Sequence, residues 1–185
     1  MRYTMAMRDR ESGFTLLELI VIIAVIAILA AIALPSFLGE SRKTKAFSEV
    51  QPMFNDMRVR LEQYLQENGS YPLTTGEVTP NPATPGTVRQ AFMPVPTDWQ
   101  PLRLRLSGTD SVFCSYTWST GRADDDANIS NQAKDPAPDG FAFATPSTEW
   151  YYLLARCDMD GDGTVFSWYF TSSTNPAILK LGEGN

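Results

Sequence analysis

Apolar residues follow two different patterns in the first third of the chain. From Leu19 to Leu34 no side chain is charged or strongly polar. Extended to Gly39, this uncharged stretch would be about 30 Å long as a helix, which matches the hydrocarbon thickness of a bilayer. After Gly39 the apolar residues recur at helical spacing, at Phe47, Val50, Phe54, Met57, Leu61 and Tyr64. The patterns predict one helix from about Thr15 to Glu67, apolar all round in its first half and amphipathic in its second.

Two prolines and a cap signal modify this expected helix. Pro35 has no backbone N–H and weakens the helix around it, and Pro52 should bend the amphipathic half locally. Asn68 and Gly69 are typical of a helix C-cap. The amphipathic half is therefore expected to end near residue 68 and to pack its apolar stripe against a globular head.

Short alternating runs separated by turn-rich segments fill the rest of the chain. Residues 74–101 are dense in proline, which predicts an irregular segment with neither helix nor central strand. The candidate strands after it are Leu102–Leu106, Val112–Trp118, Phe141–Phe143, Trp150–Cys157 and Val165–Thr171. We expect an α+β fold, in which the long helix packs on a mainly antiparallel sheet of four or five strands.

The last strands are rich in aromatic residues, which has two interpretations. Such residues could form a carbohydrate-binding surface or fill the core, and core packing is the better interpretation. The residues concerned are Trp150, Tyr151, Tyr152, Phe166, Trp168, Tyr169 and Phe170.

Composition excludes several functional classes. The chain has 185 residues, a net charge of −6 and a sequence pI near 4.6, so it should repel nucleic acid. It contains no histidine, which excludes Ser-His-Asp and Cys-His catalysis and His-ligated zinc. No nucleophile motif or phosphate-binding P-loop is present. Composition thus points away from an enzyme.

The apolar N-terminal stretch has three interpretations. It could be a plain signal anchor, or a conventional signal peptide cleaved after Ala31-Ile32-Ala33. It could also be a signal that is cleaved before the apolar run. Basic residues lie on both sides of the apolar stretch, so charge alone only weakly indicates which end of the stretch faces the cytoplasm. A short cytoplasmic tail and an exported polar remainder are the simplest arrangement.

The residues at the start of the apolar run favour the third interpretation. Gly13-Phe14-Thr15-Leu16-Leu17-Glu18 resembles the N-terminal motif of type IV pilins and type II secretion pseudopilins. The resemblance implies cleavage after Gly13 by a membrane peptidase and methylation of the new N-terminal Phe14. The family's glutamate matches Glu18 and its helix-bending proline matches Pro35. A second, weaker match is Asn68-Gly69-Ser70-Tyr71-Pro72, which resembles the exit from the long pilin helix.

Glu18 is also unusual on physical grounds alone. It is the one charged residue between Glu11 and Glu40, and a carboxylate in hydrocarbon is unfavourable by several kcal/mol unless it is paired. Cleavage after Gly13 would create an ammonium group four residues away. That group could neutralise Glu18 within one subunit or between neighbours, and the resemblance implies the second. The alternative is a glutamate that merely reaches the membrane interface.

One segment of the head has the composition of a metal site. Asp158-Met159-Asp160-Gly161-Asp162-Gly163 resembles the start of an EF-hand calcium loop, with Asp158, Asp160, Asp162 and the Thr164 carbonyl as candidate ligands. The loop departs from that pattern at its twelfth position, which is Tyr169 and not glutamate. The alternative is a solvated acidic turn. Calcium is therefore a possible ligand, and no cofactor is expected to be required.

The two cysteines predict a disulfide, and the patterns described above predict the domain bounds. Cys114 and Cys157 should form a disulfide if the head is exported. We expect a cleaved leader at residues 1–13, a membrane and filament-core half-helix at 14–39, an amphipathic half-helix at 40–68 and a β-rich head at 69–185.

The sequence favours a structural subunit, a major or minor pilin of a type IV pilus, with no catalysis of its own. Its expected partners are other pilin subunits, the prepilin peptidase and methyltransferase, and an inner-membrane assembly platform. It would lie in the inner membrane as a precursor and in a surface or periplasmic filament afterwards. The alternatives are a type II secretion pseudopilin, an exported enzyme on a signal anchor, and a calcium-dependent binding module.

Overall fold

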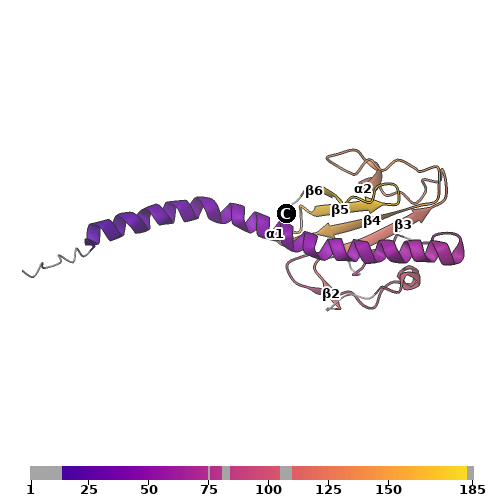
Figure 1. Ribbon diagram of the computed structural model, residues 1–185, viewed down its shortest axis with the longest axis horizontal. Helices are drawn as coiled ribbons and strands as arrows, with labels where there is room; N and C mark the ends of the chain where they lie inside the picture. The colour runs from indigo at the N-terminus through magenta and orange to yellow at the C-terminus, as the bar shows by residue number, and fades with distance from the viewer. Residues whose placement is uncertain (1–13, 75, 81–83, 105–109, 183–185) are drawn as a thin grey trace, which may run out of the picture. The chain divides into compact units, whose positions relative to one another are not determined.

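The computed structural model describes residues 14–74, 76–80, 84–104 and 110–182. The chain divides into two units, Met1–Leu38 and Gly39–Asn185. One helix, α1 (Leu16–Asn68), runs through both, and its bounds confirm the predicted helix to within a residue at each end (Figure 1). The backbone stays helical at both Pro35 and Pro52.

In the first unit, every side chain of α1 whose burial the structure describes is exposed. The most apolar 18-residue stretch of α1 has a mean hydropathy of 3.1, and 0% of this stretch is buried inside the protein. Leu16, Ile32 and Phe37 keep 75%, 71% and 70% of their surface exposed. By length and composition α1 can span a membrane, and it is the one helix of the described residues that can do so.

In the second unit, the rest of α1 buries one face. The buried side chains are Ala46, Val50, Met53, Phe54, Met57 and Leu61. Apart from the adjacent pair Met53 and Phe54, they recur every three or four residues and so lie on a single stripe, as the sequence pattern predicts. The helix ends where Gly69 adopts a φ of +77° and its N–H donates to the Leu65 carbonyl at 2.8 Å, a conformation that glycine adopts readily.

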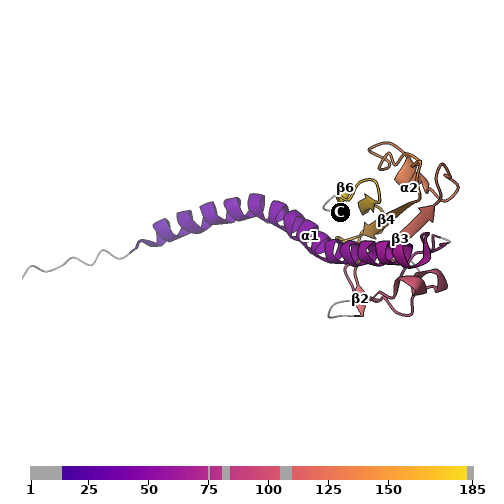
Figure 2. The same ribbon diagram turned by 45° about the vertical axis from the view of Figure 1, so that its right-hand side comes forward.

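A four-stranded antiparallel sheet packs on this half of α1 (Figures 1 and 2). Its strands are β3 (Ser115–Gly121), β4 (Trp150–Cys157), β5 (Ser167–Ser172) and β6 (Leu179–Leu181), in the spatial order β3-β4-β5-β6. A smaller antiparallel pair joins β1 (Gln90–Ala91) to β2 (Ser111–Val112). The α+β fold and its mainly antiparallel sheet are thereby confirmed.

Two hydrophobic cores lie on opposite faces of the four-stranded sheet. The larger includes the α1 stripe together with Tyr116, Trp118, Leu153 and Tyr169. The smaller forms where the segment between β3 and β4 folds over the other face, and it contains Ala133, Phe143, Trp150, Tyr152, Leu154 and Phe170. That segment carries the short helix α2 (Asn131–Lys134). Most of the late aromatic residues are therefore core residues, as the sequence analysis preferred.

Several predicted strands are wrong. Leu102 ends a 3-10 helix, η1 (Thr97–Leu102), and Arg103 follows with a φ of +46°. A left-handed residue cannot continue an extended strand, so no strand covers 102–104, while 105–106 lie outside the described residues. The proline-rich segment was also expected to lack helix, yet Pro101 lies within η1, whose Trp99 and Leu102 are buried.

The remaining differences concern one segment that is not a strand, one strand that is split and one strand that was missed. Phe141–Phe143 is irregular because Ala142 has a φ of +52°, and Phe143 packs into the smaller core. The run Val112–Trp118 is split, with Val112 in β2 and β3 beginning at Ser115. β6 was not predicted, since three residues, Leu-Lys-Leu, are too short a pattern to be distinctive.

Candidate functional site

At the N-terminal end of the described chain, Thr15 and Glu18 bind each other. The backbone N–H and the hydroxyl of Thr15 donate to Glu18 Oε2 at 3.0 and 2.9 Å. The N–H of Glu18 donates in return to Thr15 Oγ1 at 3.2 Å. This is a capping box, which satisfies free donors at the start of a helix. Thr15 was not among the predicted site residues, although a threonine three residues before a glutamate at a helix start is the usual signal of such a box.

Glu18 is the one ionisable side chain among the described residues of the first unit. Its partners in the capping box are neutral groups, so they orient the carboxylate without cancelling its charge. Phe14 precedes the helix and is 77% exposed. Gly13 lies outside the described residues, and Pro35 lies within α1. The assigned roles of these residues in processing and assembly stay predictions.

The acidic loop, residues 158–164, connects β4 to β5 and brings its three aspartates together. One carboxylate oxygen of each of Asp158, Asp160 and Asp162 lies within 4.8 Å of the others. Asp158 is buried and Asp162 is exposed. Arg42 on α1 lies 4.0 Å from Asp160, at the limit of an ion pair. Clustered oxygen ligands of this kind could hold a metal ion.

Backbone donors shape the acidic loop. The N–H groups of Gly161 and Gly163 donate to the two oxygens of Asp158 at 2.7 and 3.1 Å. The N–H groups of Val165 and Thr164 donate to Asp162 and hold the pKa of its carboxyl below its usual value. The Thr164 hydroxyl also donates to Asp162. The predicted role of the Thr164 carbonyl as a metal ligand is not addressed by these contacts.

The expected disulfide is present and ties the head together. Cys114 and Cys157 are bonded, with their Cα atoms 4.4 Å apart. Cys114 immediately precedes β3 and Cys157 ends β4, so the bond reinforces the pairing of two neighbouring strands. Both residues belong to the larger core. Such a bond fits an exported domain.

Glu49, on α1, binds the backbone beside this disulfide. The N–H groups of Phe113 and Cys114 donate to its carboxylate, each at 2.9 Å, and the Tyr116 hydroxyl donates at 2.9 Å. Burial, and then the Glu49 charge, raise the pKa of Tyr116 well above its usual value, so the phenol stays a neutral donor. Glu49 is not one of the apolar residues of the predicted stripe. Its spacing from Ala46 and Met53 was the signal that it borders the buried face.

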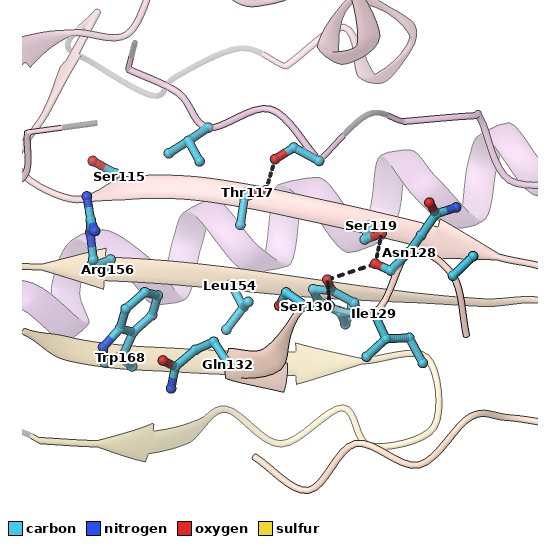
Figure 3. A pocket seen from close by; sticks show the side chains of 14 residues that line it. Ser115, Thr117, Ser119, Asn128, Ile129, Ser130, Gln132, Leu154, Arg156 and Trp168 are labelled. Carbon is cyan, nitrogen blue, oxygen red and sulfur yellow. Dashed lines mark hydrogen bonds between the residues drawn. The ribbon is translucent and has the colours of Figure 1, made fainter. Parts of the chain in front are cut away.

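A groove lies on the face of the sheet that is turned away from α1 (Figure 3). Its floor carries Ser115, Thr117 and Ser119 of β3 together with Leu154 and Arg156 of β4. The groove has a volume of about 540 Å³. Two of the lining residues, Tyr152 and Trp168, were named in the sequence among the late aromatic residues, but the groove itself was not predicted, because its lining residues come from separated segments.

Comparison with known proteins identifies the N-terminal segment. Residues 8–34 match the prokaryotic N-terminal methylation motif. The chain therefore carries the signal motif of type IV pilins and pseudopilins, as its residues from Gly13 to Glu18 indicated. No curated protein and no solved structure matches the chain.

Proposed function

We propose that this protein is a structural subunit, a major or minor pilin, of a type IV pilus. The observation that carries the proposal is the match of residues 8–34 to the methylation motif. The exposed apolar half of α1 supports it, because such a surface needs lipid or other apolar helices around it. The same motif occurs in pseudopilins, so a type II secretion pseudopilin is the alternative.

In this proposal the chain is made as an inner-membrane precursor. A prepilin peptidase removes residues 1–13 after Gly13 and methylates the amine of Phe14. Residues 14–39 first lie in the membrane and later in the filament core, residues 40–68 form the amphipathic half-helix, and residues 69–185 form the exported head. An assembly platform then adds the subunit to others in a cell-surface or periplasmic filament.

Glu18 is the proposed assembly residue. Its carboxylate lies in an otherwise apolar stretch and is oriented by Thr15. The new amine at Phe14 of a neighbouring subunit would neutralise it during assembly, because a buried carboxylate needs a cationic partner. Pro35 would let the helix unwind locally as subunits pack, since a proline removes a backbone hydrogen bond.

The head is proposed to act by binding and packing, without catalysis. Calcium is the proposed ligand of the acidic loop, held by the carboxylates of Asp158, Asp160 and Asp162 and the carbonyl of Thr164. The proximity of the three carboxylates supports this proposal. Affinity would be weak, on the order of 10⁻⁴–10⁻³ M, because a bidentate glutamate is missing. The ion would stabilise the connection from β4 to β5.

Intact-mass and N-terminal analysis of the protein from its native host tests the proposed function. We expect a chain that begins at methylated Phe14. A Gly13→Val variant should stay a full-length precursor in the membrane, whereas the neighbouring Ser12→Ala variant should be processed. Filaments that retain residues 1–13 would refute the proposal, as would a mature N-terminus at Leu34. Loss of surface filaments on gene deletion would support the pilin, and loss of protein secretion alone would favour the pseudopilin.

A further inference from the structure

The sequence holds two copies of the pattern Asn-X-Ser in which X is not proline. They are Asn68-Gly69-Ser70 and Asn128-Ile129-Ser130. An asparagine in this pattern is the acceptor for N-linked saccharides in exported proteins, provided that it lies in a surface segment. The head carries the disulfide expected of an exported domain. Both patterns therefore qualify by composition, and the surroundings of the two asparagines distinguish them.

Asn68 lies where α1 ends, in a poor position for modification. It is the last residue of the helix, and its side-chain nitrogen donates to the Tyr64 carbonyl at 3.0 Å. The nitrogen that would carry a saccharide is thus held against the helix. A transferase must also reach the asparagine and the hydroxyl two residues later from one side. A residue in a helix does not face the same way as the residue two positions later.

Asn128 lies in the connection between β3 and α2, where the chain is accessible. Every residue from 122 to 128 is exposed, and so is Ser130, which is extended with φ −69° and ψ 155°. Ser130 precedes α2, but its hydroxyl does not cap that helix. The Asn128 side-chain nitrogen donates to the Thr120 carbonyl at 3.4 Å, which is a long and therefore weak hydrogen bond. Exposed loops of this kind are the segments that modifying enzymes reach.

A saccharide on Asn128 is compatible with the folded head. The Ser119 and Tyr152 hydroxyls donate to the Asn128 carbonyl at 2.7 and 3.1 Å (Figure 3). The Ser130 N–H donates to the Tyr152 hydroxyl at 3.0 Å. These bonds hold the backbone of the loop to the sheet, and none of them uses the side-chain amide of Asn128. Modification of that amide therefore leaves the attachment of the loop in place.

The two patterns also differ at the position two residues before the asparagine. The exposed carboxylate of Asp126 lies there before Asn128, whereas the neutral Gln66 lies there before Asn68. A carboxylate close to the acceptor can form a charge-assisted hydrogen bond with a basic group of a transferase. Asp126 is paired with Lys134 at 2.9 Å, but both side chains are more than half exposed, so this pair contributes little and can exchange partners.

We propose that Asn128 is an N-glycosylation site, modified on the exported side of the membrane with a saccharide carried on a lipid diphosphate. The side-chain nitrogen of Asn128 attacks the anomeric carbon of the saccharide. The new nitrogen–carbon bond forms as the bond from that carbon to the diphosphate oxygen breaks. The amide loses one proton to a base of the transferase, and the lipid diphosphate leaves. The proposal requires export of the head and is independent of filament assembly.

Peptide mapping of the full chain from its native host tests the proposal. Cleavage after Arg122 and Lys134 gives a peptide of residues 123–134, which contains Asn128 and excludes the other pattern. We expect this peptide to carry a saccharide, which fragmentation in the mass spectrometer should place on Asn128 and not on Asn131. An unmodified peptide would overturn the proposal, as would a saccharide on another of its residues. The result does not depend on where the mature chain begins, so it is separate from the test of the proposed function.

Variants distinguish the Asn-X-Ser pattern from the loop that contains it. Asn128→Gln and Ser130→Ala should each remove the saccharide, whereas Ser130→Thr should retain it because threonine keeps the hydroxyl. Asn131→Gln in the neighbouring α2 and Asn68→Gln at the end of α1 should leave it unchanged. Formation of the Cys114–Cys157 disulfide in each variant shows that its head is exported and folded. Retention of the saccharide in folded Ser130→Ala would overturn the proposal.

Discussion

The two halves of α1 have the same backbone and opposite surroundings. Between Leu16 and Leu38 its apolar side chains are exposed, with no protein around them. Between Gly39 and Asn68 one stripe is buried by the head and the remaining faces are mostly polar. Each half also holds a glutamate whose carboxylate accepts hydrogen bonds from the backbone. Glu18 accepts from the N–H of Thr15, just before the helix, and Glu49 accepts from two N–H groups of a distant segment.

This difference separates the determinants of folding from those of assembly. The second half is covered by residues of its own chain, so its changes should alter the stability of the head. The first half leaves a surface that water solvates poorly, and its cover must come from lipid or from other chains. Changes there should alter membrane insertion and assembly while the head stays folded. Substitutions in the two halves of α1 and in the head test this separation.

The largest effect is expected from Glu18→Ala. The subunit should be processed and should fold its head normally, yet its recovery in sheared filaments should fall at least about ten-fold, because an assembling amine loses its partner. Quantitative immunoblots of filament and membrane fractions provide the measurement. Glu67→Ala, at an exposed position in the second half of α1, is the matched control and should assemble normally. Normal recovery of Glu18→Ala would mean that this glutamate is incidental.

Removal of the disulfide should be the strongest change confined to the head. The double variant Cys114→Ser, Cys157→Ser should lose about 2–5 kcal/mol of unfolding free energy, as is typical for native disulfides. Thermal unfolding of the full chain in detergent measures this loss. A reductant should shift the wild type in the same direction and leave the double variant unchanged. An equal effect of reductant on both would contradict the prediction.

Glu49→Gln should weaken the same region by a smaller amount. The amide keeps the size of the side chain but loses the charge that strengthens three hydrogen bonds from Phe113, Cys114 and Tyr116. We expect a loss of about 1–3 kcal/mol. Denaturant unfolding compared with Glu67→Gln gives the difference between a glutamate that binds the head and an exposed one. Equal stability of the two variants would show that Glu49 contributes no more than a surface residue.

Sequence alone predicted those parts of the fold that have local signals. The long helix follows from spacing that repeats over many turns, and β4 and β5 from runs of apolar and aromatic residues. Leu102–Leu106 alternates equally well, yet Arg103 takes a left-handed conformation and Leu102 is buried within η1. Tertiary packing overrode the local pattern there.

The candidate site residues also fall into those with a local sequence signal and those without one. Gly13, Phe14 and Glu18 belong to a contiguous motif and were identified from it. The three aspartates of the acidic loop alternate with other residues within one short segment, so their proximity was predictable. Glu49 has partners more than 60 positions away, and the groove is formed by segments that meet only in the folded chain. Neither could be deduced from spacing, because both depend on how the sheet is paired.

The smallest effect is expected from calcium at the acidic loop. With a dissociation constant of about 1 mM, 10 mM calcium would stabilise the folded chain by about 1.4 kcal/mol, because the ion binds only the folded state. The melting temperature of the full chain in detergent should therefore rise with calcium, and less with magnesium, which accepts irregular oxygen sites poorly. Asp160→Asn should abolish the rise, since it removes one of the three clustered carboxylates. Asp124→Asn removes an exposed carboxylate elsewhere and should leave it intact. If calcium shifts neither the wild type nor the control, the proposed calcium site is wrong, and the loop is a solvated acidic turn whose carboxylates are held by their backbone donors and Arg42.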